Sequence, residues 1–270
     1  MNRQRVLTLV RKDFLEVMRN KQALAPILVV PLILVVLIPS AVILLGGNPA
    51  LLSSINGVRP FLENLPAGFV PDGLNTQQTV IYAVIVFFMA PMFLLIPILV
   101  ASVTAASAFV GEKERRTIEG LLYTPLTDRE LVLGKVIASL IPSVGVAWTS
   151  FVMYTIVVTV LGGPVMGGAF FPTATWYVVI LLLVPLVAVL AIALIVAVSG
   201  RSTTMQGAQG LAVLVILPVL ALIVGQATGL MLFDLWVALI AAGVLLVVDV
   251  IVFALVVRSV SRERIITRLG

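Results

Sequence analysis

A dense run of charge between two strongly apolar stretches is the first place in this sequence where chemistry could occur. Residues 111–135 hold five cations and five anions. These are Lys113, Arg115, Arg116, Arg129 and Lys135, with Glu112, Glu114, Glu119, Asp128 and Glu130. Charge at this density must lie in water. It could bind a soluble partner through ion pairs, or it could be an ordinary solvated loop between two spans.

The spacing of residues inside this segment predicts two helices separated by a turn. Two pairs of opposite charge lie four residues apart, Glu112 with Arg116 and Arg115 with Glu119. Ion pairs at that spacing support a short exposed helix. Pro125 stops this helix, because proline cannot continue the backbone ladder. Thr127 and Glu130 then have the spacing of a capping box, which predicts that a new helix begins there.

No catalytic or nucleotide-binding constellation is visible. The chain contains no Cys and no His, which excludes thiol chemistry, the usual serine triad and histidine metal ligands. Gly134 and Lys135 lack the glycine-rich lead-in of a phosphate-binding loop. We therefore expect a chain that is not an enzyme, uses no ATP by itself and binds no metal or cofactor. The net charge of +5 is not taken as a sign of nucleic-acid binding, because in a membrane protein the position of the cations matters more than their sum.

One acidic residue lies deep inside an apolar segment. Asp249 is eight residues from Val257, which places it about 12 Å inside the expected helix end. An intramembrane carboxyl group marks an ion or proton site by default. The alternative is a neutral carboxyl group, or one hydrogen-bonded to Ser or Thr of a neighbouring span. Gln226, near the end of another apolar segment, is expected to be a boundary residue.

Composition indicates the class of protein to which these residues belong. Of the 270 residues, 61% are hydrophobic and only 11% are charged, with a mean hydropathy of +1.22. Soluble domains carry about 25% charged residues. The apolar runs are continuous rather than alternating, which excludes a transmembrane β-barrel. The chain is therefore a polytopic membrane protein that interacts with the lipid bilayer.

We expect an all-α fold with six transmembrane helices in a single membrane domain, residues 1–270. At about 20 residues per span, the predicted spans are 24–45, 78–110, 131–161, 175–198, 208–224 and 235–257. We expect an amphipathic interfacial helix over residues 4–21 before the first span. Its candidate functional residues are Arg11, Lys12, Phe14, Glu16 and Arg19. Small and mildly polar residues over 101–111 favour close helix packing over a polar path.

The cations predict the orientation of these spans. All but one of the 17 Lys and Arg residues fall on segments that an even number of spans places on one side, and Arg59 is the exception. Positive residues collect on the cytoplasmic side of membrane proteins. We therefore expect both termini in the cytoplasm and a multi-pass protein of the cell membrane, plasma or inner.

The charged segment, residues 111–135, resembles the passage between the second and third spans in permease subunits of type-2 ATP-binding-cassette (ABC) transporters. That family carries E-x-E-x-G-T-L-E-x-L-L-x-T-P followed by E-x-x-x-G-K. The matching residues here are Glu112, Glu114, Thr117, Ile118, Glu119, Leu121, Leu122, Thr124, Pro125, Glu130, Gly134 and Lys135. Arg116 stands where Gly is common, and Ile118 where Leu is common. The N-terminal run R-K-D-F-x-E-x-x-R-N-K, residues 11–21, is similar to the entry helix of that family.

The resemblance implies a partner and a mechanism. A permease of this kind pairs with a second permease, here expected to be an identical copy, and binds two copies of a separate ATPase that carries ATP and Mg²⁺. The resemblance makes residues 111–130 the coupling segment, with the entry helix beside it and residues 199–207 as a minor contact. The ATPase-coupling residues would be Glu112, Glu114, Arg115, Arg116, Thr117, Glu119, Thr124 and Pro125.

Two functions therefore stand at this point. The first is the membrane subunit of an ABC exporter that moves its substrate outward. The second is a self-sufficient ion-coupled carrier or channel that uses Asp249. Some relatives carry a large outer domain after the first span, whereas this chain has only residues 46–76 there. The substrate is not indicated by the sequence.

Overall fold

The structure, a computed structural model, describes residues 3–46, 68, 70–71, 73–114, 128–199, 202 and 204–259. Within those ranges every regular element is a helix. Six of the helical stretches are long and apolar enough to cross a membrane. The predicted all-α fold with six spans is confirmed. The cytoplasmic placement of the termini remains a prediction.

A separate helix precedes the first span, and each span is one helix or several that follow one another without a loop. The preceding helix is α1 (Arg3–Arg19). The first span joins α2 (Lys21–Leu32), η1 (Ile33–Leu37) and α3 (Ile38–Leu45). The second joins α6 (Thr76–Tyr82), η2 (Ala83–Phe88), α7 (Met89–Phe93), α8 (Leu95–Ala106) and η3 (Ser107–Gly111). The third joins α11 (Asp128–Val157), η4 (Val158–Gly162) and α12 (Gly163–Met166).

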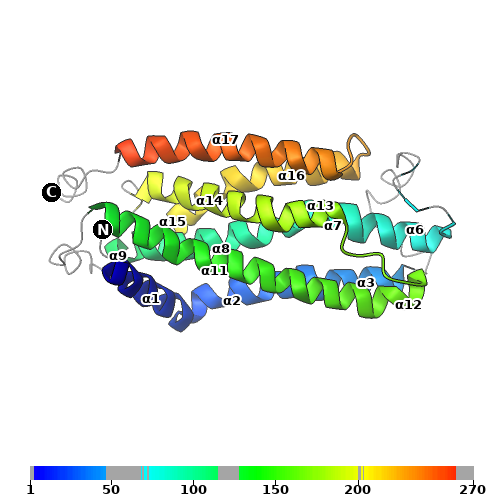
Figure 1. Ribbon diagram of the computed structural model, residues 1–270. Helices are drawn as coiled ribbons and strands as arrows, with labels where there is room; N and C mark the ends of the chain where they lie inside the picture. The colour runs from blue at the N-terminus through cyan, green and yellow to red at the C-terminus, as the bar shows by residue number, and fades with distance from the viewer. Residues whose placement is uncertain are drawn as a thin grey trace.

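The last three spans follow the same plan. The fourth joins α13 (Ala174–Val178), η5 (Val179–Leu183) and α14 (Val184–Ser199). The fifth joins α15 (Met205–Gln209), η6 (Gly210–Ala212) and α16 (Val213–Ala227). The sixth is α17 (Leu235–Ser259). The long helices run side by side (Figure 1), with α1, α15 and the short α9 (Glu112–Glu114) at one end of the bundle and α6 and α12 at the other.

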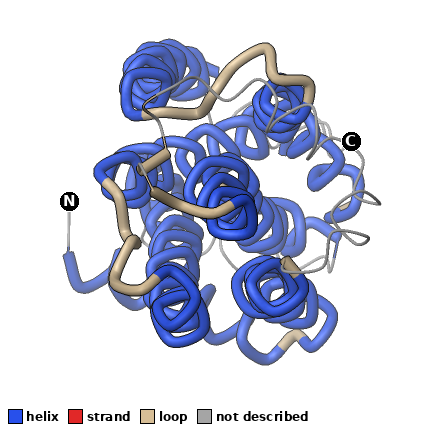
Figure 2. The backbone as a smooth tube through the Cα atoms, turned by 90° about the vertical axis from the view of Figure 1, so that its right-hand side faces the viewer, coloured by secondary structure: helices blue, strands red, loops and turns tan. Residues whose placement is uncertain are grey.

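The second span lies at the centre of the bundle, and we call it the central helix. Of its most apolar window, 78% is buried, against 17–28% for the first, third, fifth and sixth spans. The view along the helices shows the others gathered around the middle of the bundle (Figure 2). Large apolar side chains such as Val160, Trp236 and Val250 remain exposed on the outer spans. Those surfaces face lipid or another membrane protein rather than water.

Small residues let the third span approach the central helix closely. Ser102 and Thr104 of α8 are buried, and their hydroxyl groups donate to carbonyl oxygens of their own helix at 2.6 and 2.8 Å. The Thr104 hydroxyl also lies 3.3 Å from the carbonyl oxygen of Ser139 on α11. Hydroxyl groups satisfied within their own helix line no polar path. The close packing predicted from these residues is confirmed.

The central helix is irregular where Pro91 interrupts its hydrogen bonds. Proline has no N–H group, so Pro91 cannot donate to the carbonyl oxygen of Phe87, four residues earlier, or of Val86, five residues earlier. The preceding segment, η2, is a π-helix. In a membrane a freed carbonyl oxygen must find another donor within the protein.

Side chains from three other spans donate to carbonyl oxygens of η2, including the two that Pro91 leaves without a backbone donor. The Tyr154 hydroxyl donates to the carbonyl oxygen of Ile85 at 2.9 Å. The Trp176 indole N–H donates to that of Val86 at 2.9 Å, and the Gln226 amide donates to that of Phe87 at 3.4 Å. Gln226 is fully buried. Gln226 lies one residue before the end of α16, at the boundary position that the sequence predicts, but its side chain is turned into the bundle and donates to the central helix.

Aromatic rings pack around these donors. Tyr154 and Trp176 stack with ring centroids 4.9 Å apart, and Phe93 meets Trp176 edge to face at 5.5 Å. Phe151 and Phe171 complete the group, at 5.9 and 5.0 Å from Trp176. Such ring geometries add to the energy of burial. The irregular part of the central helix is therefore fixed by hydrogen bonds and by packing together.

Replacing Tyr154 by Phe tests this arrangement, because only the hydroxyl group is lost. We expect the free energy of unfolding to fall by about 0.6 kcal/mol, and by no more than about 1.7 kcal/mol, the mean and the largest coupling found for hydrogen bonds between membrane helices by double-mutant cycles. The measurement is thermal unfolding of the purified chain in mild detergent. Tyr177→Phe is the matched control, because Tyr177 is 52% exposed. Equal stability of the two variants would contradict the role given to the Tyr154 hydroxyl.

Candidate functional site

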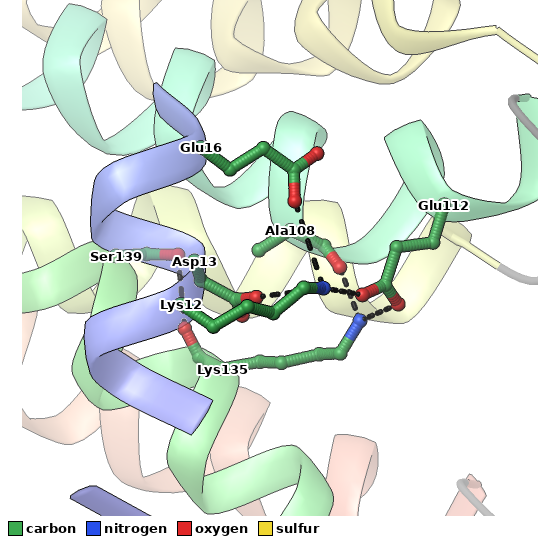
Figure 3. Close-up of polar contacts among 7 residues, drawn as sticks. All are labelled: Lys12, Asp13, Glu16, Ala108, Glu112, Lys135 and Ser139. Carbon is green, nitrogen blue, oxygen red and sulfur yellow. Dashed lines mark hydrogen bonds and ion pairs between the residues drawn. The ribbon is translucent and has the colours of Figure 1, made fainter. Parts of the chain in front are cut away.

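The carboxylate of Glu112 lies between two lysine side chains at the end of the bundle that carries α1. Glu112 is only 3% exposed. The Lys12 ammonium group donates to one carboxylate oxygen at 2.5 Å, and the Lys135 ammonium group donates to the other. Figure 3 shows both lysine side chains pointing toward this carboxylate. A single buried anion therefore joins α1, the end of the central helix and α11.

Lys135 is held by more than its ion pair. Its ammonium group also donates to the carbonyl oxygen of Ala108 in η3 and lies 5.6 Å from the centre of the Phe109 ring. The side chain is 6% exposed. An ammonium group this deeply buried needs several acceptors to offset its lost hydration. The end of the central helix supplies all of those found here.

Two further carboxylates from α1 surround Lys12. Its ammonium group lies 3.3 Å from an Asp13 oxygen and 3.6 Å from a Glu16 oxygen. Asp13 is 4% exposed, and among the described residues its second carboxylate oxygen has no hydrogen-bond partner. The two buried carboxylates therefore differ: both oxygens of Glu112 accept from an ammonium group, whereas only one oxygen of Asp13 has a partner within the described part.

The surroundings shift two pKa values in this cluster. Burial raises the pKa of Asp13 above its ordinary value, although the charges of Lys135 and Lys12 act in the opposite direction. For Lys12, burial acts to lower the pKa, but the hydrogen bond and charge of Glu112, with help from Asp13, outweigh burial and raise it. Lys12 therefore stays charged at any physiological pH. Asp13 is the residue of the cluster whose ionisation is opposed by burial.

A glycine lets α1 lie directly against α11. A Cβ atom added at Gly134 would come within 2.8 Å of the Leu9 side chain, closer than real Cβ contacts. Leu9 is buried at 6% exposure. Gly134 precedes Lys135, so the close approach of the backbones occurs beside the ion pair. In this chain, Gly134 therefore allows the close packing of α1 and Lys135 forms the ion pair with Glu112.

Glu114 connects the same end of the central helix to the fifth span. Its side chain is exposed, and one carboxylate oxygen accepts a hydrogen bond from the backbone N–H of Met205 at 2.8 Å. Met205 is the first residue of α15. A Cβ atom added at Gly111 would lie 3.1 Å from the Met205 sulfur atom, so the two segments touch. The start of α15 is thereby joined to the start of the charged segment.

The predicted residues of the entry helix, which is α1 in the structure, have different surroundings. Lys12, Glu16 and Arg19 line a hollow of about 620 Å³ together with Leu15 and Asn20. Arg11 is exposed. The backbone of Phe14 belongs to α1, and its side chain is outside the described part.

Six of the predicted coupling residues lie outside the described residues, namely Arg115, Arg116, Thr117, Glu119, Thr124 and Pro125. Glu112 and Glu114 are described, and both are engaged within the chain. The sequence placed Glu112 on an exposed helix with Arg116, whereas the structure buries it against Lys12 and Lys135. The partners lie 100 and 23 residues away in the chain. No local spacing could reveal such distant pairs.

These features define a multi-pass helical membrane protein whose entry helix, central span and third span meet in a buried ion cluster at one end. Its sequence matches the family model described as ABC-2 family transporter protein over residues 7–234. The chain belongs to this family. No protein with a curated description matches it.

Family membership fixes the general role. The chain is a permease, the transmembrane component of an ABC transporter, and not the ATPase. Permeases of this family work with an ATPase subunit. The resemblance inferred from the charged segment is confirmed, and membership favours the ABC permease over a self-sufficient carrier.

Glu112→Gln should destabilise the chain, because it leaves the buried Lys135 ammonium group without its counter-ion. Breaking a buried pair in this way costs roughly 3 kcal/mol or more. Glu16→Gln is the matched control, since Glu16 is a more distant and more exposed partner of Lys12, and its loss should cost less than about 1 kcal/mol. Thermal unfolding in mild detergent measures both. Similar losses for the two variants would rule out a bridging role for Glu112.

Asp13→Asn should not lower the stability of the chain at neutral pH, in contrast to Glu112→Gln. Because its pKa is raised in the folded chain, Asp13 favours folding most at a pH below its ordinary pKa of 3.8, and this contribution is lost as the pH rises through the raised value. At neutral pH the variant should therefore be as stable as the wild type or more stable, and its advantage should shrink on acidification. Thermal unfolding at several pH values measures this. A large loss at neutral pH would show that the Asp13 charge is needed.

Proposed function

We propose that this chain is the membrane subunit of an ABC exporter, moving its substrate outward through ATP hydrolysis in a separate ATPase that engages residues 111–130. The observation that carries the proposal is the Glu112 bridge. It holds α1 and the start of α11 to the end of the central helix, where the charged segment begins. A partner bound to that segment would push on three elements at once.

The central helix can carry such a displacement through the bundle. The second span is a continuous helical stretch of 36 residues, about 54 Å long. It is buried among the other spans, so a shift at one end must be accommodated by the helices packed around it. The contact between Glu114 and Met205 extends the linkage to the fifth span. The structure thus suits a lever moved from its charged end.

The proposed assembly contains two permeases and two ATPases. The ATPase subunits would supply ATP and Mg²⁺, and this chain would bind neither. A second copy of the chain could cover part of the apolar surface that α11 exposes at Ile141, Val152 and Ile156. Export would follow if ATPase closure at the charged end opens the bundle at the α6 and α12 end. Inverted membrane vesicles supplied with external ATP would then accumulate the cargo.

The direct experiment is purification of the chain from its native membrane in mild detergent, with mass spectrometry of the accompanying proteins. We expect a stoichiometric soluble ATPase. A lone permease across several detergents would contradict coupling through residues 111–130. The same preparation, measured by mass photometry, gives the number of permease copies.

Glu119→Lys is the sharper test of the coupling segment. Reversal of a charge at an interface that depends on ion pairs should lower the recovered ATPase roughly tenfold or more. Glu63→Lys, in the segment expected on the opposite side, is the matched control and should leave recovery unchanged. Both variants must reach the membrane in normal amounts. Full ATPase recovery with Glu119→Lys would exclude that residue from the contact.

A further inference from the structure

Asp249 is a buried carboxyl group that the coupling mechanism does not use. It is 5% exposed, although its neighbours Val247 and Val250 are 59% and 63% exposed. Neither of its oxygen atoms has a hydrogen-bond partner among the described residues. The side chain therefore points inward from a helix whose other faces are exposed on the bundle surface. No Ser or Thr of a neighbouring span, within the described part, accepts or donates to it.

The inward face of α17 is a single stripe. Asp249 lies in register with the buried or partly buried residues Ala238, Ala242, Leu245 and Val252, which alternate at intervals of three and four residues. α17 packs mainly against α14, and also against α13 and η5. The carboxyl group thus lies in a helix-packing seam.

The elements across this seam offer no charge to pair with Asp249. α14, α13 and η5 contain no Asp, Glu, Lys or Arg. Tyr177 of α13 is the one titratable side chain on them, and it is 52% exposed. Within α17, Asp249 is the only charged residue before Arg258, whose side chain lies outside the described part. An ionised carboxylate in this setting would be both desolvated and unpaired.

We propose that Asp249 is a proton-binding site in the seam between α14 and α17, occupied at neutral pH, and that loss of the proton loosens α17 from α14. The bound proton removes the charge, so the neutral carboxyl group can remain among apolar side chains. Without the proton, the carboxylate must recruit water or a cation, and the seam must open to admit it. The proposal goes beyond ATP-driven transport and gives the bundle a response to pH.

A hydrophobic carbodiimide tests the protonation state directly. Dicyclohexylcarbodiimide reacts with a protonated carboxyl group: the acid O–H adds across one C=N bond, and the acyl group then migrates to nitrogen, so the whole reagent mass is retained. The reagent is applied to native membrane vesicles containing the full chain, and the modified residue is located by mass spectrometry. Asp249→Asn is the control.

We expect Asp249 to be modified ahead of the rest of the 12 acidic side chains at neutral pH, with modification lost as the pH rises. Absence of modification at neutral pH, or modification independent of pH, would overturn the proposal. Protection by sodium chloride at constant pH would overturn it as well, since the site would then hold a metal cation instead of a proton.

The loosening of the seam has its own readout. The chain contains no cysteine, so Val252→Cys introduces a single thiol on the same stripe. The rate of maleimide labelling should rise with pH more steeply in the Val252→Cys variant than in the same variant that also carries Asp249→Asn. The ratio of the two rates is the quantity of interest, because ionisation of the thiol itself raises both rates. A ratio that stays constant over the pH range would show that α17 does not respond to Asp249.

Discussion

The structure depends on a buried negative charge that no single segment can neutralise alone. Glu112 directly follows the second span as the first residue of α9. Its two carboxylate oxygens accept hydrogen bonds from the ammonium groups of Lys12 in α1 and Lys135 in α11. Glu112 and Lys135 would each be costly to bury alone, whereas Lys12 remains 47% exposed. Their mutual satisfaction therefore requires that three segments distant in sequence come together in one arrangement. The gain is specificity of arrangement more than raw stability, because a buried ion pair roughly offsets its own desolvation.

The opposite half of the central helix is fixed by a different kind of interaction. There Pro91 leaves the carbonyl oxygens of Val86 and Phe87 without a backbone donor, and Trp176 and Gln226 donate to them. Tyr154 adds a third neutral hydrogen bond, to the carbonyl oxygen of Ile85. The central helix is thus held by ions where it meets the charged segment and by neutral hydrogen bonds deeper in the bundle. Ionic contacts at the end of the bundle lie where water or a partner can replace them, whereas neutral hydrogen bonds deep in the membrane have no such replacement. Movement should accordingly begin at the Glu112 end.

Sequence reasoning was most successful where the signal is local. The continuous apolar runs predicted six spans, and the motif around Glu112 and Pro125 identified the family. It failed where the partner is distant: Glu112 was assigned to an exposed helix, although Lys12 and Lys135 bury it. Gln226 does lie at the end of α16, as predicted, but only the geometry of η2 shows that its amide reaches a carbonyl group without a backbone donor. Pro91 was the available clue, since a proline within a buried helix frees carbonyl groups that polar residues elsewhere must satisfy.

Glu112 and Asp249 show how the same functional group takes opposite roles in one bundle. Glu112 has two ammonium partners, so its charge is the feature that binds helices together. Asp249 has no charged neighbour on the elements described around it, so its charge would drive helices apart. The first carboxyl group must stay ionised for the structure to hold, and the second must stay neutral. A bundle with both has one contact that a protein partner can displace and another that opens when a proton is lost. The two lie on different helices, so each can be altered without removing the other.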